Sequence, residues 1–177
     1  MQLDKAIRER RSIRKYTNKK VSFSDITEIC DVARLAPMAA NMFTLKILIV
    51  SDKEKIKKMT EMAQQPFIAD VSYVLVICSN KKNIVKTYGN WGVKSARQQA
   101  GAAIENILLK ITDLGLSSCW LGWFDDKAIK NLLKIPEDID IEALLPIGYA
   151  AEKPKKIFKP ELKSILYFDE WNKTEKK

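Results

Sequence analysis

The residues of this chain best suited to chemistry form a cationic segment near the N-terminus, Arg10-Arg11-Ser12-Ile13-Arg14-Lys15-Tyr16. An arginine guanidinium presents a planar fork of N–H donors that matches two oxygens of a phosphate or carboxylate. Ser12 adds a hydroxyl donor for the same oxygens. The segment therefore suits a monophosphate, although a solvated basic helix end that complements the helix dipole stays open as an alternative.

The chain contains no histidine, which removes several classes of mechanism. Ser-His-Asp and Cys-His catalysis are excluded, as is every metal site with a histidine ligand. The sequence has three cysteines, Cys30, Cys78 and Cys119, and their small number and dispersed positions argue against a cysteine-only zinc or iron–sulfur site within one chain. No G-x-x-x-x-G-K-[ST] or G-x-G-x-x-G motif occurs. If the chain is an enzyme, we expect a bound cofactor to supply the reactive group, with no catalytic side chain and no metal.

Length and composition favour a single domain over residues 1–177. Apolar residues make up 46% of the chain, which suits a globular fold with a sizeable core. No apolar run approaches the roughly 20 residues needed to span a bilayer, and the N-terminus lacks the apolar core of a signal peptide. With its odd number of dispersed cysteines, the sequence predicts a cytoplasmic protein without membrane attachment.

The formal net charge of +9 makes nucleic-acid binding an alternative to weigh. The sequence has no zinc-finger spacing, no basic zipper and no basic–aromatic motif of the kind that stacks on bases. An anionic small ligand accounts for a focused part of the charge, and solubility accounts for the remainder. We therefore expect no nucleic-acid partner.

Hydrophobic periodicity predicts the elements that must position the cationic segment. Ser22 or Ser24 caps a helix that continues to about Leu35 and ends before Pro37. The remaining pattern predicts strands over 45–50, 73–78, 117–124 and 143–149, helices starting at the caps Asp52 and Asp125, and a longest helix over 96–114.

Two connecting segments are candidates for the lining of a pocket. The turn Met38–Asn41 precedes a buried strand, and an asparagine amide there suits the edge of a heterocycle, although an ordinary Asn turn is the alternative. The polar stretch 79–94 carries Tyr88 and Trp91, and we interpret it as a loop or lid, with an excursion that has no function as the alternative.

Two further features point to a second subunit. Small residues on the 96–114 helix permit a close helix crossing, either within the chain or with another copy. The last residues are unusually apolar for a chain end and need a surface to cover, on a partner or on their own domain: Phe158, Leu162, Ile165, Leu166, Tyr167, Phe168 and Trp171.

The order of motifs along the chain resembles the FMN-dependent nitroreductase family from about Lys5 to Ile165. The motifs are R-R-S-I-R-K-Y at 10–16, A-P-M-A-A-N at 36–41, L-G-L-S-S-C-W-L-G-W-F at 114–124, K-I-P-E at 134–137, L-L-P-I-G-Y-A at 144–150 and K-x-x-K-P at 156–160. The first motif and the G-L-x-S-x-W-x-G-x-F pattern are the most specific.

The resemblance implies an α+β fold with a mostly antiparallel central sheet flanked by helices, assembled as an intertwined homodimer. Two FMN molecules would lie at the dimer interface. The C-terminal tail, about 153–177, would extend over the partner subunit, which agrees with its apolar composition.

The resemblance also implies a set of cofactor contacts. By similarity Arg10 and Ser12 would hold the FMN phosphate with Arg11 nearby, while Arg14 would approach the ribityl chain and the pyrimidine edge of the flavin. A cation there would stabilise negative charge on the reduced ring. The remaining contacts would be the turn residues Pro37, Met38, Ala39 and Asn41 from the other subunit, backbone donors of Leu121 and Gly122, and Lys159, or else Lys156, at the phosphate.

Some positions depart from the family pattern. Many relatives have serine after the proline and Gln-Pro-Trp after the asparagine, where this chain has Met38, Phe43, Thr44 and Leu45. The changes remove polar groups near the flavin ring, so they bear on its polar contacts and on the choice of substrate.

The function implied is an FMN-dependent oxidoreductase in which NAD(P)H delivers hydride to the flavin, followed by reduction of a nitroaromatic, quinone or similar planar acceptor. Two alternatives stay open. One is a flavoenzyme of the same fold with different chemistry, such as dehalogenation, flavin breakdown or use of another electron donor. The other is a non-catalytic flavin- or nucleic-acid-binding module. The sequence identifies neither the acceptor nor the preferred nicotinamide.

Overall fold

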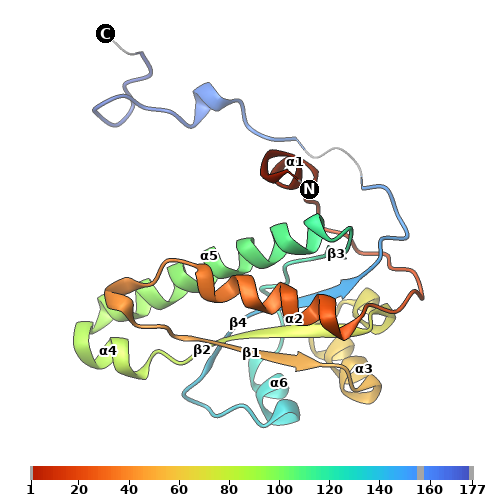
Figure 1. Ribbon diagram of the computed structural model, residues 1–177. Coiled ribbons are helices and arrows are strands. Elements are labelled where there is room, and N and C mark those ends of the chain that lie inside the picture. Colours follow the sequence, from red (N-terminus) through yellow and green to blue (C-terminus); the bar gives the residue numbers. More distant parts are fainter. Residues whose placement is uncertain (1, 155–157, 176–177) are drawn as a thin grey trace.

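A computed structural model describes residues 2–154 and 158–175, and its centre is an antiparallel sheet (Figure 1). Four strands pair in the order β1-β2-β4-β3. The strands are β1 (Leu45–Val50), β2 (Tyr73–Ser79), β3 (Ser117–Ser118) and β4 (Asp140–Gly148). This confirms the expected mixed fold of helices around an antiparallel sheet.

Helices cover both faces of the sheet (Figure 1). Residues of α2 and α5 pack with Leu75 and Ile77 of β2 on one face, whereas residues of α3 and α6 pack with Val74 and Val76 on the other. The α-helices are α1 (Leu3–Glu9), α2 (Phe23–Asp31), α3 (Lys53–Met62), α4 (Lys82–Tyr88), α5 (Asn90–Asp113) and α6 (Asp126–Leu133). Since β2 is apolar toward both faces, it occupies the centre, as predicted.

The predicted helix starts are confirmed by their caps. Ser22 Oγ accepts a hydrogen bond from the Asp25 N–H at 3.0 Å, and Asp52 and Asp125 cap α3 and α6 in the same way. Each cap satisfies a backbone donor that has no partner within the helix. A 3-10 turn, Val32–Leu35, continues α2 until Ala36 becomes extended before Pro37.

The stretch 79–94 is not the loop or lid that its polarity predicted. It forms α4 and the first turn of α5, which meet at Gly89 with a φ of 55°. Gly92 packs so closely on α4 that a Cβ there would lie 2.5 Å from the Ile84 carbonyl oxygen. Most side chains of these turns are exposed, so the sequence shows little apolar periodicity even though the backbone is helical.

The predicted strand over 117–124 is also shorter than expected. Regular pairing covers Ser117 and Ser118, and an isolated bridge joins Leu121 to Leu144 of β4. The chain then turns into the cap of α6, which ends its alignment with the sheet.

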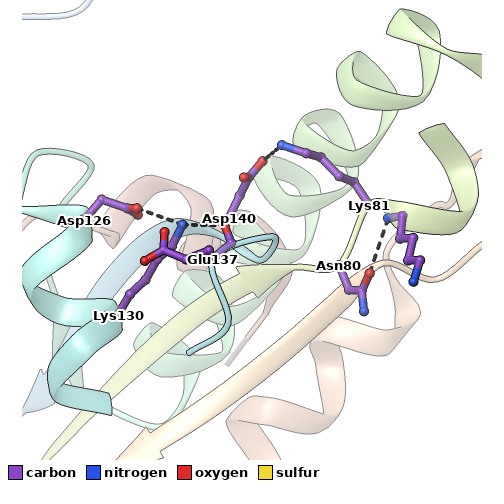
Figure 2. Close-up of polar contacts among 7 residues, drawn as sticks. Asn80, Lys81, Asp126, Lys130, Glu137 and Asp140 are labelled. Carbon is purple, nitrogen blue, oxygen red and sulfur yellow. Dashed lines mark hydrogen bonds and ion pairs between the residues drawn. The ribbon is translucent and has the colours of Figure 1, made fainter. Parts of the chain in front are cut away.

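Two lysines fasten helices to the start of β4, as Figure 2 shows. Lys81, just before α4, forms an ion pair with Asp140. The buried Lys130 of α6 contacts Asp126 Oδ2 at 3.0 Å and donates to the Glu137 carbonyl at 3.2 Å. Both α4 and α6 are therefore anchored where β4 begins.

The described tail, 158–175, runs away from the body of the molecule (Figure 1). Its hydrogen bonds and ion pairs are all made within the tail itself. Phe158 and Trp171 are more than four-fifths exposed, at 85% and 81%. Within the described residues, no helix is both long and apolar enough to cross a membrane.

Candidate functional site

The cationic segment extends the edge of the sheet. Ser12 pairs in parallel with Ser118 of β3, and the Ile13 N–H donates to the Ser118 carbonyl at 3.0 Å. Tyr16 forms an antiparallel bridge with Ala150, just beyond β4. The backbone from Ser12 to Tyr16 is thus held along β3 and the end of β4, at the side of the molecule where α5 ends (Figure 1).

Two of the predicted phosphate ligands already have partners in the chain. The Arg10 guanidinium forms an ion pair with Glu105 of α5, with Nε and Oε1 3.3 Å apart. The Arg11 Nη1 donates to the carbonyl oxygens of Arg8 and Arg10 at 2.7 and 2.8 Å. Arg11 therefore caps the C-terminal end of α1, where carbonyl groups lack partners within the helix.

Arg14 differs from its two neighbours. Its backbone N–H donates to Glu152 Oε1 at 2.8 Å, while its exposed guanidinium makes no hydrogen bond or ion pair among the described residues. Close by, the Ser118 hydroxyl is buried and has no hydrogen-bond partner in the described structure. Among the described residues, the segment thus carries one unpaired cation, and the strand that pairs with it at Ser12 carries one unpaired buried hydroxyl.

Two buried groups beneath the segment respond to its charge. Tyr16 donates its hydroxyl to the Ile13 carbonyl at 2.8 Å, and burial raises the pKa of this phenol far above its usual value. Burial also raises the pKa of the Cys119 thiol, while the Arg14 charge and the Ser12 hydroxyl act in the opposite direction. Both groups are neutral at physiological pH, so neither carries a negative charge that would offset the cations of the segment.

Leu121 and Gly122 follow β3 along the same edge of the sheet. The Leu121 N–H donates to the Leu144 carbonyl at 3.1 Å, so the expectation of a free backbone donor at Leu121 needs correction. Pairing with β4 consumes that donor. Gly122 is exposed, its N–H makes no hydrogen bond among the described residues, and a Cβ built on it would meet nothing within 4 Å. Of the two predicted donors, the one on Gly122 is accessible.

The other predicted contacts lie elsewhere in the chain. The turn that contains Pro37, Met38, Ala39 and Asn41 is mostly exposed and lies beside α4, at the opposite end of the molecule from the Arg10–Arg14 segment (Figure 1). One chain therefore does not bring the two groups of residues together. Lys159 is exposed in the tail, and Lys156 lies outside the described residues.

Some residues that complete this arrangement were not predicted from the sequence. Ser118 belongs to the G-L-x-S-x-W pattern, which offered a signal, because the pattern was among the most specific in the chain. Glu105 and Glu152 offered none. They reach Arg10 and the Arg14 backbone from positions more than 90 residues away in sequence.

Residues 2–177 match the family described as “Putative TM nitroreductase”. The chain belongs to this nitroreductase family. Among the curated nitroreductase relatives, a protein of Archaeoglobus fulgidus named “Putative NADH dehydrogenase/NAD(P)H nitroreductase” is 36% identical over 154 residues, which are 84% of this chain and 86% of that protein.

Two more relatives extend the comparison. The “FMN reductase [NAD(P)H]” of Bacillus subtilis is 28% identical over 173 residues, which cover 89% of this chain and 69% of that protein. The solved FMN-dependent nitroreductase of Clostridium difficile R20291 superposes with a TM-score of 0.79 at 26% identity, covering 94% of this chain and 98% of that one. The nitroreductase fold thus extends over nearly the whole chain.

Proposed function

We propose that this nitroreductase-family protein is a homodimeric FMN-dependent NAD(P)H oxidoreductase. The observation that carries the proposal is the segment along β3, where Arg14 and the buried Ser118 hydroxyl lack partners among the described residues. An exposed guanidinium without a partner suits an anionic ligand, and the unpaired hydroxyl on the adjacent strand departs from the rule that buried hydroxyls are hydrogen-bonded. The names of the relatives, which mention FMN and NAD(P)H, support the same conclusion.

The residues present fit a phosphorylated flavin. Ser12 and Arg14 would contact its phosphate and ribityl part, and the accessible Gly122 N–H would face its ring. Arg10 would join the phosphate contacts by exchanging its partly exposed ion pair with Glu105, and pairs near the surface contribute little stability, typically about 0–1 kcal/mol. Bound FMN would supply hydride chemistry, accepting a hydride from NAD(P)H and reducing a nitroaromatic, quinone or similar planar acceptor.

A dimer would bring together the two groups of predicted contact residues that lie at opposite ends of one subunit. Pro37, Met38, Ala39 and Asn41 of one subunit would then approach the cofactor held by the Arg10–Arg14 segment of the other. Their exposure within one chain supports this arrangement, because a turn that serves a partner's site needs no cover from its own subunit. Lys159, or else Lys156, would complete the phosphate contacts.

An apolar groove offers a place for the partner's tail. It has a volume of about 370 Å³ and lies between α1, α5 and the 3-10 turn after α2, where Leu3 and Leu35 are 69% and 63% exposed. The described tail carries its own exposed apolar residues, Leu162 and Ile165. Burying both sets together would remove apolar surface from water, and each Å² of apolar area buried contributes about 25 cal/mol of stabilising free energy. Tail exchange would therefore stabilise the dimer.

The proposal is tested by the absorption spectrum of the purified protein, followed by anaerobic titration with NADH and with NADPH. We expect a flavin spectrum, bleaching by at least one of the two donors, and reoxidation by a nitroaromatic or a quinone. A panel that also contains free flavin and a halogenated phenol separates this activity from flavin breakdown and dehalogenation. A colourless protein that FMN cannot reconstitute would contradict the proposal.

A further inference from the structure

The turn before β1 has a strained backbone. Ala40 and Asn41 are successive non-glycine residues in the left-handed region, with φ values of 51° and 57°. An L-residue in this region has its Cβ close to its own carbonyl oxygen, so the conformation persists only where neighbouring contacts enforce it. The Met42 N–H donates to the Ala39 carbonyl at 2.9 Å and closes the turn, and because the turn is otherwise exposed, its remaining support comes from the segments on either side.

The segment on the C-terminal side is fixed at Thr44. Its N–H and its hydroxyl both donate to Oε1 of Gln99 on α5, at 2.8 and 2.6 Å. Its carbonyl accepts from the Asn80 N–H at 2.8 Å. Thr44 and Gln99 are each 3% exposed, so water does not compete for these hydrogen bonds. Three residues after Asn41, the chain is thus held by the buried Gln99 amide oxygen together with the Asn80 backbone N–H.

Gln99 is an unusual residue for the buried face of α5. That face otherwise carries small or apolar residues such as Ala96, Ala100 and Ala103, and the Gln99 Nε2 has no partner among the described residues. A buried amide with unpaired donors lowers stability, whereas an apolar side chain of similar size would remove those donors but leave the Thr44 N–H and hydroxyl without their acceptor. Local rules are broken in this way mostly at functional sites.

We infer that Gln99 is a positioning residue of the cofactor site. Its carboxamide oxygen fixes Thr44 and thereby holds the Pro37–Asn41 turn in the shape with which that turn meets the flavin of the other subunit. The inference rests on the proposed function for the role of the turn. It assigns Gln99 no contact with cofactor or substrate.

The test compares Gln99→Met with Gln98→Met, because Gln98 is the neighbouring, exposed glutamine on the same helix. The first readout is the dissociation constant of FMN measured by flavin fluorescence. The second is amide hydrogen exchange of residues 39–44 in the flavin-free protein. Ile104→Val adds a control that destabilises the buried face of α5 without touching Thr44.

We expect Gln99→Met to weaken FMN binding about tenfold or more and to accelerate exchange in the turn. Gln98→Met and Ile104→Val should keep the wild-type FMN affinity, and Thr44→Val, which removes one of the two hydrogen bonds, should fall between. If Gln99→Met does not fold, Thr44→Val carries the same comparison.

Wild-type affinity and wild-type exchange in Gln99→Met would overturn the inference. The same holds for an affinity loss in Ile104→Val equal to that in Gln99→Met, since the effect would then follow stability alone. Failure of the wild-type protein to bind FMN is a separate result that contradicts the proposed function, and the exchange comparison then still decides whether Gln99 holds the turn.

Discussion

The two halves of the proposed cofactor site are held in different ways. The Arg10–Arg14 half is held by backbone pairing, since Ser12 and Ile13 meet Ser118 and the chain continues along the end of β4. The Pro37–Asn41 half is a strained turn held by the side chain of Gln99 through Thr44. Backbone pairing tolerates most substitutions, whereas a side-chain anchor depends on one residue. We therefore expect the second half to be the more sensitive.

The largest effect is expected where α4 and α5 cross, beside the second half. In Gly92→Ala the new Cβ would lie 2.5 Å from the Ile84 carbonyl oxygen, which belongs to the backbone and cannot move aside. We expect a loss of about 3 kcal/mol in the free energy of unfolding, measured with urea. Gly101→Ala on the same helix is the control, because its Cβ meets nothing within 4 Å and alanine favours a helix by up to about 1 kcal/mol. Equal stabilities of the two variants would contradict close packing at Gly92.

A smaller loss in the free energy of unfolding is expected for a glycine-to-alanine substitution beside the Arg10–Arg14 half. In Gly148→Ala the new Cβ would lie 2.8 Å from Cδ1 of the buried Tyr16 ring. A side chain can shift where a backbone cannot, so we expect a loss of about 2 kcal/mol, again from urea unfolding. Because Tyr16 supports the Arg10–Arg14 segment, FMN affinity should fall as well. A loss of stability in Gly148→Ala as large as that in Gly92→Ala would remove the proposed difference between the halves.

Within the first half, Arg14 and Arg11 should separate binding from stability. Arg14→Gln removes the guanidinium that has no partner in the described structure, so FMN affinity should fall about tenfold with little change in stability. Arg11→Gln removes two hydrogen bonds to carbonyls at the end of α1 and should cost about 1 kcal/mol of stability. Fluorescence titration and urea unfolding on both variants test this. Unchanged FMN affinity in Arg14→Gln would show that this cation does not serve the cofactor.

The smallest effect appears only at alkaline pH. Burial raises the pKa of the Cys30 thiol, on the helix that leads to the turn, from 9.0 to about 11. A folded-state pKa above the unfolded value means that this contribution to stability is complete below about pH 9 and is lost as the pH rises toward 11. The urea midpoint should therefore decline over this range, and Cys30→Ala should reduce the decline. At pH 7 the titration contributes no difference between the two proteins. A decline that is identical in both would exclude Cys30 as its source.

Much of the architecture could be predicted from local sequence patterns. The caps at Ser22, Asp52 and Asp125, the buried strand β2 and the end of a helix before Pro37 all depend on residues within a few positions of one another. Motif order also indicated the nitroreductase family that the comparison over residues 2–177 then established. Such features need no knowledge of distant contacts, because capping and hydrophobic periodicity are properties of neighbouring residues.

The tertiary structure decided which polar groups are free. Arg10, Arg11 and Arg14 look equivalent in sequence, yet Glu105 pairs with the first, the end of α1 occupies the second, and the third stays unpaired among the described residues. Likewise, Gln98 and Gln99 are adjacent, and their difference depends on Thr44, 55 residues from Gln99. The helices over 79–94 also escaped prediction, because most of their side chains are exposed and the sequence there shows little apolar periodicity. Residue type sets what a side chain can bind. Only the folded chain determines which side chains already have a partner and which remain available to a ligand.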